Sequence, residues 1–124
     1  MNSPRLSATI RRTVEWSDTD ASGHHHNAFI IRLIEAAERE LMEANGAELV
    51  WAEGTPRVRH EIDYTAPLYF GQPVTATIEL QRLGRASVTY GFEVWGEEHA
   101  GRPRRRAASG TVVAAHVPRG AERA

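Results

Sequence analysis

The sequence contains no cysteine, which excludes disulfide bonds, thiolate metal sites and a cysteine nucleophile. It has no apolar run close to the roughly 18 residues of a transmembrane helix. The segment Met1 to Arg5 lacks the apolar core of a signal peptide. The formal net charge is -1, so there is no basic excess to attract nucleic acid. We therefore expect a cytoplasmic protein whose partners include neither a membrane nor a nucleic acid.

The 124 residues suit one domain with one modest core. No internal repeat or low-complexity segment divides the chain. The residues after Pro118 are small and polar, and we expect a frayed tail there. The prediction is a single domain over residues 1–124, with its core over about residues 8–117.

Two carboxylates and three histidines crowd the segment from Asp18 to Asn27. Before it, residues 9–16 alternate between polar and apolar with a period of two, apart from Arg12, which is typical of a half-buried strand. After it, residues 28–45 have the spacing of a helix. A helix start carries unpaired N–H groups and partial positive charge, so it can hold an oxyanion. A carboxylate beside such a site suits hydrolysis.

The expected helix has one apolar stripe, which needs a broad surface to cover. Asn27 is a good N-cap for it and Gly46 a good stop. The stripe consists of Ile30, Leu33, Ile34, Ala37, Leu41 and Ala44.

Four further segments alternate with a period of two and supply that surface. Their short connections, such as the turn Leu83–Arg85, favour antiparallel pairing. One long helix on one face of an antiparallel sheet is an α+β architecture. The four segments are residues 57–64, 74–81, 87–94 and roughly 105–117.

Three motifs, in order, resemble the hotdog-fold thioesterases, specifically the 4-hydroxybenzoyl-CoA thioesterase-like group. Trp16–His24 is similar to a strand end followed by D-x-D-x-x-G-H. Ile62–Leu68 and Gly71–Val74 are similar to Y-x-x-P followed by G-D-x-V, and Leu83–Ser87 to the next hairpin. Each motif alone is weak evidence, but their order and placement predict the fold.

The resemblance implies a single hotdog domain, an antiparallel sheet wrapped around one long central helix. It implies hydrolysis of acyl-CoA or acyl-carrier-protein thioesters without metal or other cofactor, by a homodimer or homotetramer with active sites at the subunit interface. The catalytic carboxylate maps onto Asp20, and the backbone N–H that polarises the thioester carbonyl onto Asn27. His24 stands in the motif and either orients the turn or contacts substrate.

An ordinary aspartate is ionised at neutral pH, so Asp20 can attack the thioester directly or activate a water. The sequence does not choose between these roles. We expect Asp18 to be structural, accepting backbone N–H groups in the turn. Gly23 permits a tight conformation or close approach of substrate.

The run His24-His25-His26 invites a zinc interpretation, but adjacent histidines project in different directions and no HExxH spacing supports it. We therefore predict no metal. His60 lies on the apolar side of its expected strand. It is either a hydrogen-bonded core histidine, which we favour, or a substrate contact.

Basic residues near two turns are candidates for the phosphates of CoA or an acidic carrier protein. The alternative is a solvated rim, which is favoured for Arg102, Arg104, Arg105 and Arg106, whereas Arg82 and Arg85 are evenly balanced. Ser87, in the same hairpin as Arg85, is counted with the substrate-binding residues. Trp51 either packs on an acyl pocket or covers the core.

Two alternatives to a thioesterase stay open. A hotdog hydratase or dehydratase would share the fold and the thioester substrate, but we find no D-x-x-x-x-x-H arrangement suited to it. A non-catalytic acyl-binding module would not need Asp20. Release of free thiol from acyl thioesters separates the three.

Overall fold

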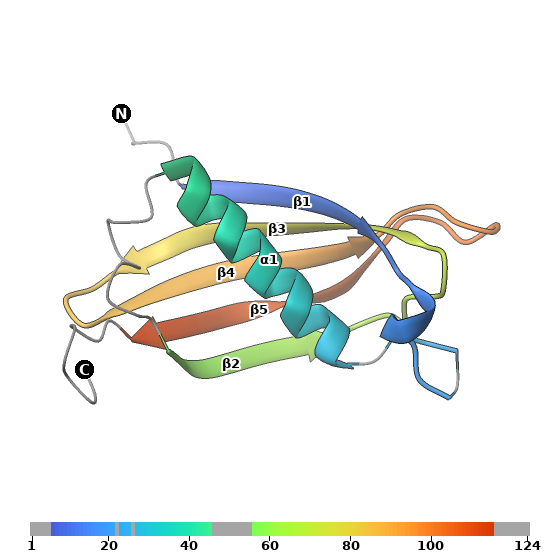
Figure 1. Cartoon of the computed structure of the whole chain (residues 1–124), viewed down its shortest axis with the longest axis horizontal. Helices are drawn as coiled ribbons and strands as arrows, with labels where there is room; N and C mark the ends of the chain where they lie inside the picture. Colours follow the sequence, from blue (N-terminus) through green and yellow to red (C-terminus); the bar gives the residue numbers. More distant parts are fainter. Residues whose placement is uncertain (1–5, 22, 26, 46–55, 116–124) are drawn as a thin grey trace.

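A computed structural model describes residues 6–21, 23–25, 27–45 and 56–115 (Figure 1). Gly46, Trp51 and the tail after Pro118 lie outside the described residues. The elements in this part of the chain are β1 Ser7–Thr13, the 3-10 helix η1 Trp16–Asp18, α1 Asn27–Asn45, β2 Arg57–Tyr64, β3 Pro73–Leu83, β4 Ser87–Gly96 and β5 Arg105–Ala115.

The five strands form one sheet in the order β1-β3-β4-β5-β2, and every neighbouring pair is antiparallel. Helix α1 crosses one face of this sheet diagonally (Figure 1). The chain therefore has the expected α+β architecture of one long helix on an antiparallel sheet. Strands β1 and β2 form its two edges.

The core lies between α1 and the sheet. The register places Ile10, Ala76, Val94 and Ala108 in one row across four strands, and all four are buried. The helix covers such rows with its own apolar stripe, as expected from the helical spacing, except that Ala44 in the last turn is exposed. Its fully or nearly fully buried apolar residues are Phe29, Ile30, Leu33, Ile34, Ala37 and Leu41.

Two boundaries around the motif differ from the sequence prediction. Strand β1 ends at Thr13 rather than continuing to residue 16, and the Trp16 side chain is 72% exposed. The reason is that η1 begins at Trp16 and breaks the alternation of the strand. Asn27 is the first residue of α1 rather than its N-cap.

The predicted apolar face of β2 is largely uncovered. Val58 is 60% exposed and Tyr64 is 44% exposed, and only Ile62 packs partly against the core. His60 is also exposed, so its interpretation as a core histidine is wrong. The physical reason is that β2 is an edge strand, whereas α1 packs on β1 and β3.

One charged residue lies on the buried face of α1. Glu38 is 1% exposed, and its carboxylate forms an ion pair with the guanidinium of Arg57 at the start of β2. Burial raises the pKa of Glu38, and the charge of Arg57 opposes that rise. Burial and the nearby Glu38 charge also raise the pKa of Tyr90. The pair links the helix to the edge strand.

Removing Arg57 should destabilise the fold in a pH-dependent way. Because the pKa of Glu38 is raised on folding, its contribution to stability is present at acidic pH and is lost as pH rises. Arg57→Ala removes the charge that limits this loss. We expect a cost on the order of 3 kcal/mol near pH 8 and much less near pH 4, measured by urea unfolding.

Arg59→Ala is the matched control, because Arg59 pairs with Glu61 on the same strand and both side chains are exposed. It should cost less than about 1 kcal/mol at either pH. An equal loss at pH 4 and pH 8 for Arg57→Ala would show that the Glu38 charge is not what Arg57 compensates.

Candidate active site

The 3-10 helix η1 leads into the motif and is tied to α1 by Asp18. Oδ2 of Asp18 accepts a hydrogen bond from the backbone N–H of Glu15 at 2.8 Å, and Oδ1 of Asp18 accepts one from the Arg32 guanidinium at 2.9 Å. This confirms the structural role expected for Asp18. The backbone at Asp18 is helical, so Asp18 and Asp20 do not follow the alternation of an extended strand.

Residues 19–21 and 23–25 form a small hairpin around Asp20, and we call them the catalytic turn because Asp20 is the candidate catalytic carboxylate. The Asp20 N–H donates to the His24 carbonyl at 2.9 Å, and the Gly23 N–H donates to the Asp20 carbonyl at 3.0 Å. Thr19 and His25 pair beside this loop in antiparallel fashion. Gly23 has φ +87°, a backbone angle that residues with a side chain rarely adopt, so the expected tight conformation is confirmed. The hairpin leaves Asp20 exposed.

The outgoing side of the catalytic turn rests on the segment Leu68–Tyr69. The His25 N–H donates to the Leu68 carbonyl at 2.9 Å, and the Leu68 N–H donates to Nδ1 of the buried His25 ring at 3.0 Å. Nδ1 must be unprotonated to accept this bond. The His24 ring packs edge-on against Tyr69, with centroids 5.2 Å apart. Sequence patterns alone assign no role to His25, because its partner Leu68 lies 43 residues away.

A hollow of about 290 Å³ opens at the start of α1. Its lining includes Asn27, the His25 ring and the Tyr64 ring, and the two rings stack with centroids 6.4 Å apart. Thr65, Ala66 and Pro67 complete the lining. Asp20 precedes this hollow in the chain and is not among its lining residues.

The electrostatics of the helix start favour an anion. Asn27 is the first helical residue, so its N–H belongs to the group without a partner inside the helix. The first turn of α1 contains no acidic residue, so no carboxylate within the helix offsets the positive end of its dipole. These features favour negative charge near the start of α1.

Comparison with known proteins decides the family. A family model described as the thioesterase superfamily matches residues 22–101, more than half of the chain. The chain belongs to the thioesterase superfamily. This membership confirms the expected class of enzyme, a thioester hydrolase. The match begins after Asp20 and does not include either carboxylate of the motif.

Solved structures of other thioesterases share the fold. A predicted thioesterase from Bacillus stearothermophilus is 27% identical, with a TM-score of 0.74 over 90% of this chain and 80% of that one. A 1,4-dihydroxy-2-naphthoyl-CoA thioesterase from Synechocystis is 17% identical, with a TM-score of 0.77 over 95% and 88%. A mutant 4-hydroxybenzoyl-CoA thioesterase bound to 4-hydroxybenzoyl-CoA is 18% identical, with a TM-score of 0.81 over 95% and 89%. No protein of curated function matches the chain.

The thioesterase chain does not gather all the predicted substrate-binding residues in one place. Gly23 lies in the catalytic turn, and His60 lies on the exposed edge strand β2. Arg82, Arg85 and Ser87 lie at the β3–β4 hairpin, at the end of the sheet opposite to the catalytic turn (Figure 1). A single chain therefore cannot bring this hairpin to its own Asp20.

The basic residues between 102 and 106, which follow β4, lie closer to the catalytic turn than the β3–β4 hairpin does. The Arg102 guanidinium lies over the Tyr69 ring at 3.7 Å from its centroid. Arg104 and Arg106 are engaged in ion pairs with Glu97 and Glu93. Of this cluster, Arg102 is thus connected to the turn through Tyr69, which sequence order did not reveal.

Two larger hollows lie away from the catalytic turn. One, of about 540 Å³, lies between β1 and α1, and the other, of about 420 Å³, lies on strands β3, β4 and β5. Neither is lined by a residue of the catalytic turn. In the described part of the chain, no three histidine or acidic side chains are grouped as a metal site would require. Nor does this part contain a helix long and apolar enough to cross a membrane.

Proposed function

We propose that this thioesterase hydrolyses an acyl-CoA or acyl-carrier-protein thioester, with Asp20 as nucleophile or general base. The observation that carries the proposal is the hairpin that contains Asp20 and leads along the chain into the start of α1, where a hollow lined by Asn27 opens. The Asn27 N–H and the helix dipole would stabilise the oxyanion. His24 would contribute its carbonyl, which fixes the Asp20 backbone.

Two routes fit this arrangement. As general base, the Asp20 carboxylate takes a proton from water while the water oxygen attacks the thioester carbon, and the tetrahedral oxyanion then expels the thiolate. As nucleophile, the carboxylate itself attacks and expels the thiolate, leaving an anhydride that water cleaves to the acid. Both routes consume one water and need no cofactor.

Release of free thiol is the deciding measurement. The purified chain should liberate thiol from at least one member of a panel of short-chain, long-chain and aromatic acyl-CoAs and matching acyl-carrier proteins. The Asp20→Asn variant supplies the background. A hydratase or dehydratase would modify the acyl group without releasing thiol, and a binding module would only bind it. Either result would refute the proposal.

We also propose that two chains pair through their β2 edges. An edge strand with exposed Val58 and Tyr64 is a liability in a lone chain. A two-fold axis that pairs β2 with the β2 strand of a second chain in antiparallel orientation makes the two sheets run in opposite directions. The β3–β4 hairpin of one chain then lies on the same side as the catalytic turn of the other, so Arg82 and Arg85 can serve the site across the interface. A tetramer would be a pair of such dimers.

Mixed dimers test this arrangement. Arg82→Ala/Arg85→Ala should raise KM more than it lowers kcat, because phosphate binding is lost equally in ground and transition states. When the Arg82→Ala/Arg85→Ala chain is co-expressed with the Asp20→Asn chain, each mixed dimer regains one site. That site combines Asp20 from the first chain with the two arginines from the second. Random pairing in a two-fold dimer should restore low-KM activity to about a quarter of wild type.

If Asp20 and the arginines came from the same chain, mixing would restore nothing. In that case every site would lack one set or the other. A monomer by light scattering at micromolar concentration, with activity retained, would likewise contradict the dimer.

A further inference from the structure

The segment 68–72 braces the catalytic turn on both of its flanks. On the incoming side, the Val14 N–H donates to the Gln72 carbonyl at 2.9 Å, and the Gly71 N–H donates to the Val14 carbonyl at 2.8 Å. On the outgoing side, Leu68 bonds to His25 through both backbone groups. The position of this segment therefore sets where the turn begins and where it returns to α1.

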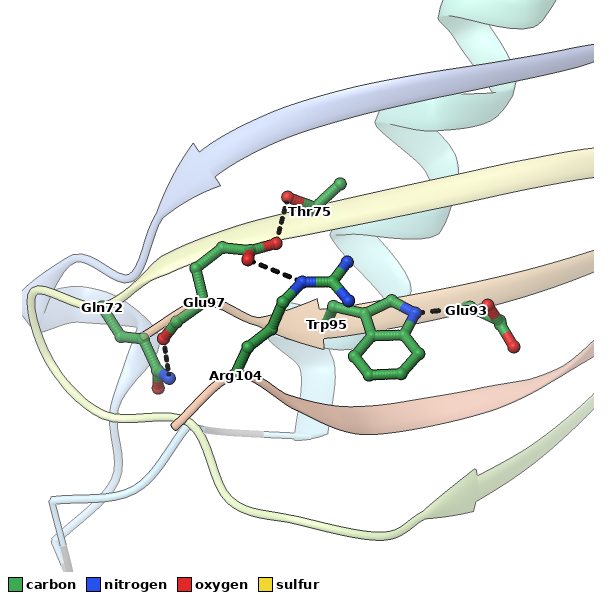
Figure 2. Close-up of polar contacts among 6 residues, drawn as sticks. All are labelled: Gln72, Thr75, Glu93, Trp95, Glu97 and Arg104. Carbon is green, nitrogen blue, oxygen red and sulfur yellow. Dashed lines mark hydrogen bonds and ion pairs between the residues drawn. The ribbon is translucent and has the colours of Figure 1, made fainter. Parts of the chain in front are cut away.

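Gln72 holds this segment together. It is 4% exposed, and its Oε1 accepts the Tyr69 N–H at 3.1 Å while its own N–H donates to the Tyr69 carbonyl at 3.0 Å. Its Nε2 donates to the Glu97 carbonyl at 2.9 Å, as Figure 2 shows. The side chain thus closes the turn 69–72 and joins it to the end of β4.

The neighbours of Gln72 are arranged to keep its amide in place. A Cβ at Gly96 would lie 2.7 Å from Nε2 of Gln72 and 2.7 Å from Cδ2 of Leu68, so a side chain there would displace one or both. Glu97 is held in turn by Thr75 at 2.6 Å and by Arg104 at 2.7 Å (Figure 2). Those two bonds also lower the pKa of Glu97, the Thr75 hydroxyl most. The G-D-x-V pattern that this chain resembles has a carboxylate at this position, which has no N–H for the Glu97 carbonyl.

We propose that Gln72 is a positioning residue for catalysis, acting through Tyr69 and Leu68 on the catalytic turn. This inference rests on the proposed role of Asp20. The bond from the Tyr69 N–H to Oε1 is the essential one, because it lies on the path from Gln72 to the turn. The bond to Glu97 anchors the amide.

Three variants separate positioning from stability. Gln72→Leu removes the acceptor for Tyr69, and a displacement of the turn by a fraction of an ångström should lower kcat by about tenfold to a hundredfold with little change in KM. Gln72→Glu keeps that acceptor and should retain kcat within about threefold of wild type, on the same reasoning. Thr75→Val, the matched control, loses a bond to Glu97 while sparing Tyr69, and should also retain kcat. All are assayed where urea unfolding shows each to be fully folded.

Wild type and Asp20→Asn are measured in the same assay, so a failure of the proposed function is seen separately. Amide hydrogen exchange at Asp20 then tests the brace without any activity, and Gln72→Leu should accelerate it while Thr75→Val should not. If Gln72→Leu does not fold, Gln72→Asn replaces it, since it is polar but one methylene too short to reach both partners. Wild-type kcat and exchange in Gln72→Leu, or an equal loss of kcat in Gln72→Glu, would overturn the inference.

Discussion

Asp20→Asn is expected to lower kcat by roughly 10²–10⁴, the usual worth of a positioned acid, base or nucleophile. The substitution preserves size and polarity but removes the charge and most of the nucleophilicity. Folding should survive, because the bonds of the Asp20 backbone N–H to the His24 carbonyl and of the Gly23 N–H to the Asp20 carbonyl remain. Thiol release from the best thioester measures kcat, and thermal unfolding confirms the fold.

Asp18→Asn is the natural control and should show the opposite balance. Asp18 accepts bonds from the Glu15 N–H and from Arg32, so losing its charge should cost about 1–2 kcal/mol of stability. The loss of kcat should be much smaller than for Asp20→Asn. If Asp20→Asn hydrolyses thioesters at the wild-type rate, the assignment is wrong, and Asp18 or His24 becomes the next candidate.

Local periodicity was enough to predict the layers of this fold. The period-two segments became strands because alternate residues such as Ala76 and Ile78 face α1 and are buried. Helix α1 ends at Asn45 as expected and begins one residue before the expected Ala28. The error at Trp16 has a local cause, because Asp18 bonds back to Glu15 and starts a turn before the alternation ends.

Burial on an edge strand cannot be predicted in the same way. Val58, His60 and Tyr64 alternate like core residues, but their exposure depends on what covers β2. Glu38 presents the reverse case. Its spacing from Ile34 and Leu41 places it in the apolar stripe, and a charge there signals a partner, which is Arg57 across the sheet.

The supports of the site depend on long-range partners that no local pattern encodes. His25 meets Leu68, and Gln72 meets Glu97, over separations of 43 and 25 residues. The position of Arg85, at the end of the sheet opposite to the catalytic turn, was predictable in principle. Successive hairpins of an antiparallel sheet lie at alternate ends, and β3 begins next to the segment that supports the catalytic turn.

Asn27→Pro should lower kcat by roughly 10²–10³, the cost of one lost oxyanion donor. Asn27 is the first residue of α1, where proline is well tolerated because its fixed φ suits the helix and its missing N–H has no helical partner. The substitution therefore removes the proposed donor with little damage to the helix. Because the negative charge develops only in the transition state, kcat should fall while KM changes little.

Asn27→Ala separates the backbone from the side chain. It keeps the N–H, and since Asn27 lies inside the helix rather than at its cap, both kcat and stability should stay near wild type. Circular dichroism should show the same helix content in both variants, and thermal unfolding should show that both keep a stable fold. A wild-type kcat in Asn27→Pro would place the oxyanion donor elsewhere. A large loss in Asn27→Ala would mean that the side chain itself contacts the substrate in the hollow that Asn27 lines with His25 and Tyr64.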